Sequence, residues 1–311
     1  MAIPFFSIDF KSKDWASFIG GTLGLTSKSE KEKKLIDLLK KRFPDKEVTL
    51  FPSARMAFYF VLKNTFKSGD EVIFPVMGFP LYVKIALQLN LNPKYVDVEE
   101  EHLTIDVNKL EESITKNTKG IVITHLFGYP CNMDIVMQIA NKYNLPVIED
   151  CAQSYDSFYK GKETGTFGYA GIFSCSLMKV PTSLGGGILL TEDKTLFQNI
   201  NNNLKDNLFN KSFLFQLNYF IKNFLSILNS YPLLYSLLSH RVFGFIKKRN
   251  PATLRKILYS GMGLASNQYD QWERPKLSNY QLAVGNSQFN RSSQMTKIRQ
   301  SHSKLMTSEL S

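Results

Sequence analysis

The chain has 311 residues, 43% of them hydrophobic, and carries a formal net charge of +11 at pH 7. This length fits one large domain, or one domain plus part of another, and the apolar content can fill a substantial core. Because the three cysteines have no paired or metal-binding spacing and the lysines are spread along the chain without a nucleic-acid motif, we expect no disulfide framework, no metal site and no nucleic-acid partner.

The N-terminal region has no leader pattern and gives two structural signals. Residues 1–10 lack a basic stretch followed by an apolar core, so we expect no secretory signal and a cytoplasmic location. The pair Gly20-Gly21 predicts a turn. Residues 27–43 place leucines on one face and lysines elsewhere, which predicts an amphipathic helix.

A strand, a turn and a helix follow one another in the next segment. Residues 48–51 are typical of a short strand, and Ser53 precedes an apolar helix over residues 56–63. This order leaves the backbone N–H groups of Ala54 and Arg55 at a helix start, where a phosphate can bind. An ordinary capped helix explains the same pattern.

Strands and helices then alternate at the spacing of a parallel α/β sheet. The predicted strands cover residues 71–75, 95–98, 120–125 and 147–149, the predicted helices cover 106–114 and 133–143, and residues 160–162 form a hairpin turn. In such a sheet, ligands bind beyond the carboxyl ends of the strands. His125 and Asp150 both stand at such ends, and for His125 a structural role is as well supported as a catalytic one.

A lysine and a glycine cluster follow Asp150 further along the chain. Lys179 comes after the strand-like residues Phe173-Ser174, and Gly185-Gly186-Gly187 comes after the lysine. A buried lysine can bond covalently to a carbonyl cofactor, and a carboxylate can keep a pyridine nitrogen protonated. These are the two protein groups that pyridoxal phosphate (PLP) most needs.

Several motifs resemble those of the DegT/DnrJ/EryC1/StrS sugar aminotransferases. Residues 149–153 read Glu-Asp-Cys-Ala-Gln, residues 173–179 read Phe-Ser followed by Lys at the family spacing, and residues 69–75 match Gly-Asp-Glu-Val-x-x-Pro. The resemblance runs from about residue 30 to residue 200 and resumes at residues 276–285. It implies an α/β chain with the large domain of PLP fold type I, in which helices flank a mostly parallel central sheet.

The resemblance also implies roles for individual residues. Lys179 would hold PLP covalently, Asp150 would pair with the pyridine nitrogen, and Gln153 would contact the ring or its 3-oxygen. The phosphate and the ring face would be contacted by Ser174, by the N–H groups of Ala54 and Arg55, and by Phe79. Without the resemblance, Phe79 is better explained as a core residue.

The implied function is transfer of an amino group from glutamate or glutamine to a keto sugar, usually nucleotide-linked, in surface polysaccharide or glycoconjugate biosynthesis. The implied partners are the keto sugar, the donor amino acid and a second copy in a homodimer. A related branch has His in place of the lysine and catalyses dehydration, and Lys179 argues against that branch. Arg274 stands where family members offer Asn to the neighbouring subunit's phosphate.

We expect three segments along the chain. Residues 1–203 form the PLP-binding large domain, residues 204–260 an apolar helical insertion, and residues 261–311 the end of the large domain with a linking helix. The family's smaller C-terminal domain is not found in the sequence. A non-catalytic, truncated homologue that acts as a membrane-associated scaffold is therefore the alternative function.

The insertion favours two interpretations equally. Between Ser212 and Ser239 the only charged residue is Lys222, yet Pro232 interrupts the segment and no apolar run reaches the length of a membrane-spanning helix. Aromatic and leucine-rich pieces with a basic flank suit helices that lie on the inner membrane face. Packing against the same domain or a partner explains them as well. The sugar, the aminated carbon and the donor stay open.

Overall fold

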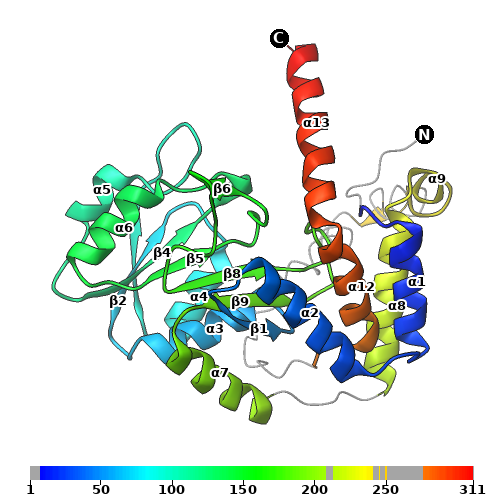
Figure 1. Ribbon diagram of the computed structural model, residues 1–311. Coiled ribbons are helices and arrows are strands. Elements are labelled where there is room, and N and C mark those ends of the chain that lie inside the picture. The colour runs from blue at the N-terminus through cyan, green and yellow to red at the C-terminus, as the bar shows by residue number, and fades with distance from the viewer. Residues whose placement is uncertain (1–7, 208–212, 241–244, 246–248, 251–275, 311) are drawn as a thin grey trace. The chain divides into compact units, whose positions relative to one another are not determined.

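The computed structural model describes residues 8–207, 213–240, 245, 249–250 and 276–310 (Figure 1). The chain divides into two compact units. One contains Met1–Ser12 and Asn207–Lys276, and the other contains Lys13–Asp206 and Leu277–Ser311.

The larger unit is built on a seven-stranded sheet with the order β1-β9-β8-β5-β4-β2-β3. The strands are β1 (Glu47–Phe51), β2 (Glu71–Pro75), β3 (Asn92–Val96), β4 (Thr118–Thr124), β5 (Val147–Asp150), β8 (Ala170–Ser174) and β9 (Gly187–Thr191). Strand β9 runs antiparallel to both of its neighbours, and the other pairings are parallel. The predicted mostly parallel sheet is therefore confirmed. The expected hairpin is also present, as β6 (Phe158–Tyr159) and β7 (Lys162–Glu163).

Helices cover both faces of this sheet, as expected for an α/β fold. Those of the larger unit are α1 (Ser12–Thr22), α2 (Lys28–Arg42), α3 (Ala54–Thr65), α4 (Pro80–Gln88), α5 (Val107–Glu112), η1 (Leu126–Gly128), α6 (Met133–Lys142), α7 (Lys194–Asn207), α12 (Asn279–Asn290) and α13 (Ser292–Leu310). Side chains from α2, α5, α6 and α12 join the core on one sheet face. Helix α3 contacts the opposite face, where Phe58 meets Phe74 of β2.

The smaller unit is helical where the structure describes it. It contains α8 (Phe213–Asn229), α9 (Pro232–Leu234) and η2 (Tyr235–Ser239). The Tyr231 hydroxyl donates a hydrogen bond of 3.1 Å to the carbonyl oxygen of Phe10 in the same unit. In the part of the chain that the structure describes, no helix has the length and apolarity needed to cross a bilayer.

The predicted turn at Gly20-Gly21 is wrong, because both residues lie in the last turn of α1. Gly21 is needed for close packing rather than for a turn. A Cβ atom there would lie 2.5 Å from Tyr280 Cα and 3.0 Å from Ala283 Cβ, so α1 approaches α12 at this point with no room for a side chain. At Gly20 the nearest atom to such a Cβ would be Leu25 Cδ1 at 3.5 Å, which is ordinary contact.

These two neighbouring glycines give a matched pair for testing the helix contact. We expect Gly21→Ala to lower the free energy of unfolding by about 1–3 kcal/mol, because α1 must move away from α12. Gly20→Ala should leave stability unchanged or raise it by up to about 1 kcal/mol, since alanine is the better helix former. Urea unfolding of both variants measures the difference. Equal stability of the two would contradict the close approach at Gly21.

Candidate active site

Asp150, the last residue of β5, is buried on the sheet face that α3 and α4 cover. Its Oδ1 accepts the Ala152 N–H at 3.0 Å, and its Oδ2 accepts a longer bond of 3.4 Å from the Thr124 hydroxyl, which stands at the same register on β4. Burial raises the pKa of the Asp150 carboxyl, while the Ala152 N–H and the charge of Lys179 act in the opposite direction. The carboxylate can therefore gain stabilisation from a further positive group.

Lys179 lies on the loop between β8 and β9, and its side chain is half-buried. Burial lowers the pKa of its ammonium group, and the nearby Asp150 carboxylate opposes that shift. A lowered pKa increases the fraction of neutral amine, the form that attacks a carbonyl. The structure thus brings together the two residues that the sequence paired only by motif.

The loop that carries Lys179 is held by internal hydrogen bonds. The buried Thr182 hydroxyl donates to the Ser176 carbonyl at 2.8 Å and accepts the Leu184 N–H at 2.9 Å. From α12, the Gln281 amide donates to the Leu184 carbonyl at 3.4 Å. These contacts restrict the backbone on the C-terminal side of Lys179.

The glycines after this loop lie against the start of α3. A Cβ atom on Gly187 would lie 2.4 Å from the Ala54 nitrogen, and Gly186 forms a β-bridge with Ser53. Ser53 caps the helix by accepting the Met56 N–H at 3.3 Å. The first-turn N–H groups of α3 therefore lie close to the carboxyl ends of the strands, where an anion gains from the helix dipole.

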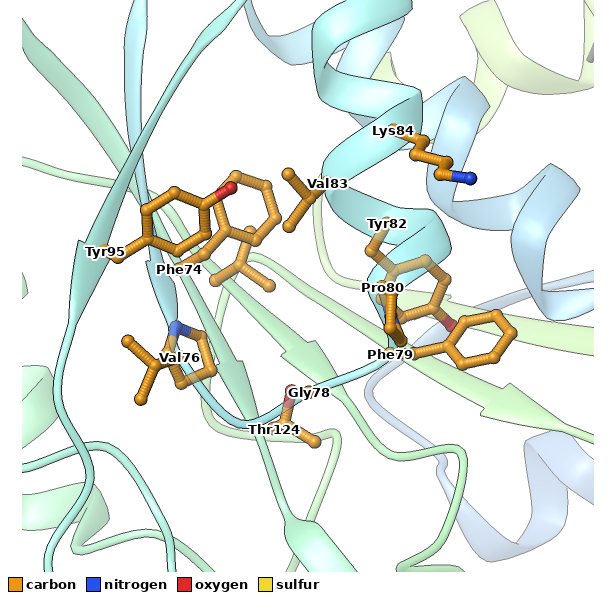
Figure 2. A pocket seen from close by; sticks show the side chains of 12 residues that line it. Phe74, Val76, Gly78, Phe79, Pro80, Tyr82, Val83, Lys84, Tyr95 and Thr124 are labelled. Atoms are coloured by element: carbon orange, nitrogen blue, oxygen red, sulfur yellow. The ribbon is translucent and has the colours of Figure 1, made fainter. Parts of the chain in front are cut away.

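An aromatic cluster and a cavity lie beside Asp150. The Phe79 and Tyr82 rings, at the start of α4, meet edge to face at 5.5 Å, and Tyr82 stacks on Phe58 at 3.9 Å. A cavity of about 330 Å³ opens there, and Phe79, Tyr82 and Thr124 are among its lining residues (Figure 2). Burial and the Asp150 carboxylate raise the pKa of the Tyr82 phenol, whereas the Arg55 guanidinium lowers it.

Three other predicted site residues are Ser174, Gln153 and Arg274. Ser174 ends β8 and accepts the Ser176 N–H at 3.4 Å, and exposed Gln153 accepts the Phe127 N–H through its Oε1 at 3.2 Å. This bond leaves the Gln153 amide N–H₂ to turn toward a ligand. Arg274 lies outside the described residues.

Glu149 is the residue that sequence reasoning missed and on which this region depends. Its fully buried carboxylate accepts N–H groups from Gly165 at 2.7 Å, Phe167 at 2.8 Å and Gly168 at 2.6 Å. It also bonds His125 Nε2 at 3.0 Å. Because His125 Nδ1 accepts the Cys131 N–H at 3.1 Å, the ring carries its proton on Nε2 and donates it to Glu149. His125 thus has the structural role.

The cluster of His125, Glu149 and Cys151 has the atom spacing of a metal site, but its donor atoms are already used. The hydrogen bonds above occupy the Glu149 oxygens and the His125 Nδ1 lone pair. Burial raises the pKa of the Cys151 thiol to about 12, so the thiolate that metals prefer is not formed. We therefore assign no metal to this cluster.

Comparison with known proteins gives one family and a set of partial relatives. Residues 25–210 match the model of the DegT/DnrJ/EryC1/StrS aminotransferase family. GDP-perosamine synthase of Escherichia coli O157:H7 is 41% identical over 129 residues, which are 42% of this chain and 35% of that protein. An L-glutamine:2-deoxy-scyllo-inosose aminotransferase of Streptomyces lividus is 36% identical over 126 residues, 40% of this chain and 30% of that protein. The chain spans about a third of the length of these curated relatives.

The solved structures agree on the fold. A mutant of GDP-4-keto-6-deoxymannose-3-dehydratase with bound GDP-perosamine superimposes with a TM-score of 0.71 at 19% identity, covering 97% of this chain and 72% of that one. At this identity the likeness concerns the fold alone. It confirms the fold type I architecture expected from the sequence.

The buried Glu149 carboxylate makes the stability of the protein depend on pH. Burial raises its pKa, but the bonds from His125, Gly168 and Gly165 outweigh that effect and hold the pKa below its ordinary value. The unfolded chain therefore binds more protons at this residue, and stability falls as the pH drops below about 4.3, the ordinary glutamate pKa.

We expect Glu149→Gln to lower the free energy of unfolding at pH 7 by about 2–4 kcal/mol, because an amide N–H₂ would face backbone N–H donors. The variant should also lose less stability than the parent on acidification. Glu112→Gln, at an exposed position, should change stability by no more than about 0.5 kcal/mol. Urea unfolding across the acid range measures both effects, and an unchanged acid slope in Glu149→Gln would contradict the assignment.

Proposed function

The chain belongs to the DegT/DnrJ/EryC1/StrS aminotransferase family, and we propose that it is a PLP-dependent aminotransferase acting on a keto sugar. The observation that carries the proposal is the pair of Asp150 and Lys179. A buried carboxylate with a raised pKa lies near a lysine with a lowered pKa. Residues with pKa values shifted in this way are often found in catalytic sites.

The donor set fits PLP on three counts. Asp150 offers a buried carboxylate for a protonated pyridine nitrogen, and Lys179 offers a nucleophilic amine for the aldehyde. The start of α3, close to Gly187, offers N–H groups for the phosphate. When bound, PLP supplies a ring that withdraws electrons from the substrate's α-carbon.

We assign each residue a role toward the bound cofactor. Asp150 would keep the ring nitrogen protonated, and Phe79 would contact one ring face. Gln153, whose Oε1 accepts the Phe127 N–H, would contact the ring or its 3-oxygen. Ser174, with the N–H groups of Ala54 and Arg55, holds the phosphate.

Lys179 also has the proton-transfer task. Its Nζ is neutral in part because burial lowers its pKa, so Lys179 could serve as the base that accepts the α-proton of the amino donor and as the acid that gives a proton back. The Arg55 guanidinium lies near enough to Tyr82 to lower the pKa of its phenol.

For substrates we propose glutamate or glutamine as donor and a nucleotide-linked keto sugar as acceptor, in surface polysaccharide or glycoconjugate biosynthesis. The support is the family match together with two relatives, one named GDP-perosamine synthase and the other a glutamine-dependent aminotransferase. Lys179, in place of the histidine of the dehydrating branch, favours amine transfer.

We propose residues 1–203 as the PLP-binding large domain and 204–260 as the insertion. Residues 261–311 would form the end of the large domain with a linking helix. The compartment we propose is the cytoplasm, with the inner membrane face as a site of peripheral contact through 204–260. Three free, buried cysteines fit a reducing compartment.

The first test of this proposal is covalent labelling. After loading with PLP and reduction with borohydride, peptide mass mapping should place the pyridoxyl group on Lys179. Lys160→Ala, at an exposed lysine, should be labelled like the parent, and Lys179→Ala should not be labelled. A pyridoxyl group on another lysine, or none in loaded protein, would favour the scaffold alternative.

Asp150→Asn separates cofactor binding from chemistry. An amide cannot keep the ring nitrogen protonated, so we expect the rate of the first half-reaction with glutamate or glutamine to fall by roughly a hundredfold or more. Labelling at Lys179 should persist. A half-reaction at the parental rate would remove Asp150 from the mechanism.

We further propose a homodimer, with Arg274 of one copy reaching the phosphate held by the other. Light scattering of PLP-loaded protein should give twice the chain mass, and Arg274→Ala should weaken PLP retention without changing that mass. A monomer with full PLP occupancy would argue against a shared site.

A further inference from the structure

Helix α8 exposes several apolar residues along one face. Leu214, Ile221 and Leu225 are 75%, 45% and 52% exposed and fall at helical spacing on one face. On the opposite face Asn223 and Ile227 are almost fully buried, at 5% and 0% exposure. A helix that only packs onto its own protein keeps its apolar residues mainly on the buried face, so the exposed apolar face of α8 needs a separate explanation.

Further exposed apolar side chains follow along the chain. Leu217 adds to it on α8, Leu233 follows in α9, and Leu237 in η2. Phe245 is 57% exposed, and the Arg249 guanidinium lies 4.7 Å from its ring centre. We define the apolar stripe as Leu214, Leu217, Ile221, Leu225, Leu233, Leu237 and Phe245. An aromatic ring paired with a basic group is a combination that suits a membrane interface.

The charge of this segment has a single sign. Residues 207–269 contain eight Lys and Arg residues and no Asp or Glu, so they supply much of the net charge of +11. In α8 itself Lys222 is the one charged residue, and it is exposed beside the stripe. Apolar side chains flanked by cations complement a bilayer with anionic headgroups, where each basic residue adds to attraction.

We propose that the apolar stripe binds the surface of a membrane that contains anionic lipid, with α8 lying in the interfacial plane. The exposed apolar face of α8 calls for an external apolar partner, because exposed surface of this kind marks an interaction site. The absence of acidic residues over 207–269 selects lipid, since a protein partner would have to match one long stretch of unbalanced positive charge. This inference gives residues and lipid chemistry to the contact proposed above, and it does not depend on PLP.

Vesicle flotation of the full chain tests the proposal. At low salt, the protein should float with vesicles of phosphatidylcholine and phosphatidylglycerol and remain unbound with phosphatidylcholine alone. High salt should reduce flotation, because it screens the charge attraction. Protein that stays in the soluble fraction with both vesicles at low salt would overturn the proposal.

Two triple variants locate the surface. Leu214→Gln, Ile221→Gln and Leu225→Gln together should reduce vesicle partitioning roughly tenfold or more, because three apolar anchors are lost. The matched control places the same change at Ile298, Leu305 and Met306, which are exposed apolar residues of α13. It should float like the parent. Circular dichroism melts check that both variants fold.

The outcomes separate the rival occupants. Equal flotation of the stripe variant and the parent would overturn the assignment of these residues. Loss of an oligomer in the stripe variant by light scattering, with no vesicle binding by the parent, would make the stripe a protein interface and refute the lipid proposal. Lys179 labelling is measured on the same variants, so failure of flotation and failure of the aminotransferase proposal are told apart.

Discussion

The site depends on one buried carboxylate, Glu149, which accepts three backbone N–H groups and the His125 ring. A buried charge without such partners would cost several kcal/mol. Its four donors come from the segment after β4 and from residues 165–168, so satisfying this one group fixes two loops against β5. Because successive strand residues point to opposite faces, fixing Glu149 on one face also fixes Asp150 on the other.

Because of this alternation, two neighbouring residues differ in role: Glu149 supports the structure, and Asp150 is the proposed cofactor contact. Glu149 is saturated by hydrogen bonds and cannot take part in a reaction without breaking them. Asp150 accepts the Ala152 N–H at 3.0 Å and the Thr124 hydroxyl at 3.4 Å, and the Tyr82 phenol and the Lys179 charge also interact with it. The hydrogen bonds of Glu149 hold the strand end rigid, while Asp150 keeps a carboxylate with fewer hydrogen bonds. Because Asp150 is buried, an electrostatic contact with it is stronger than it would be in water.

The sequence predicted the order of strands and helices well, because periodicity and caps are local properties. In the structure, Ser27, Ser53 and Asp106 cap α2, α3 and α5, which are short-range contacts within each helix start. The prediction of a turn at Gly20-Gly21 failed, because Gly21 is required by close packing against α12, which is distant in sequence.

The same limit applies to the site. The sequence identified Asp150 and Lys179 because they belong to motifs, but Glu149 was read as part of a motif without a role of its own. Its partners are backbone N–H groups, which leave no trace in residue identity. Tyr82 was missed too, although it lies one helical turn after Phe79 and so on the same face, which is a usable signal.

The strand order has a consequence for synthesis of the chain. Among the strands that the structure describes, β1 is made first and lies at the edge of the sheet, and the strand it pairs with, β9, is made last. Until residue 191 has left the ribosome, β1 has no strand to pair with and the start of α3 has no Gly187 beside it. The start of α3 therefore meets Gly187 only after Asp150 has been made, and a nascent chain carries an unpaired strand through most of the sheet's synthesis.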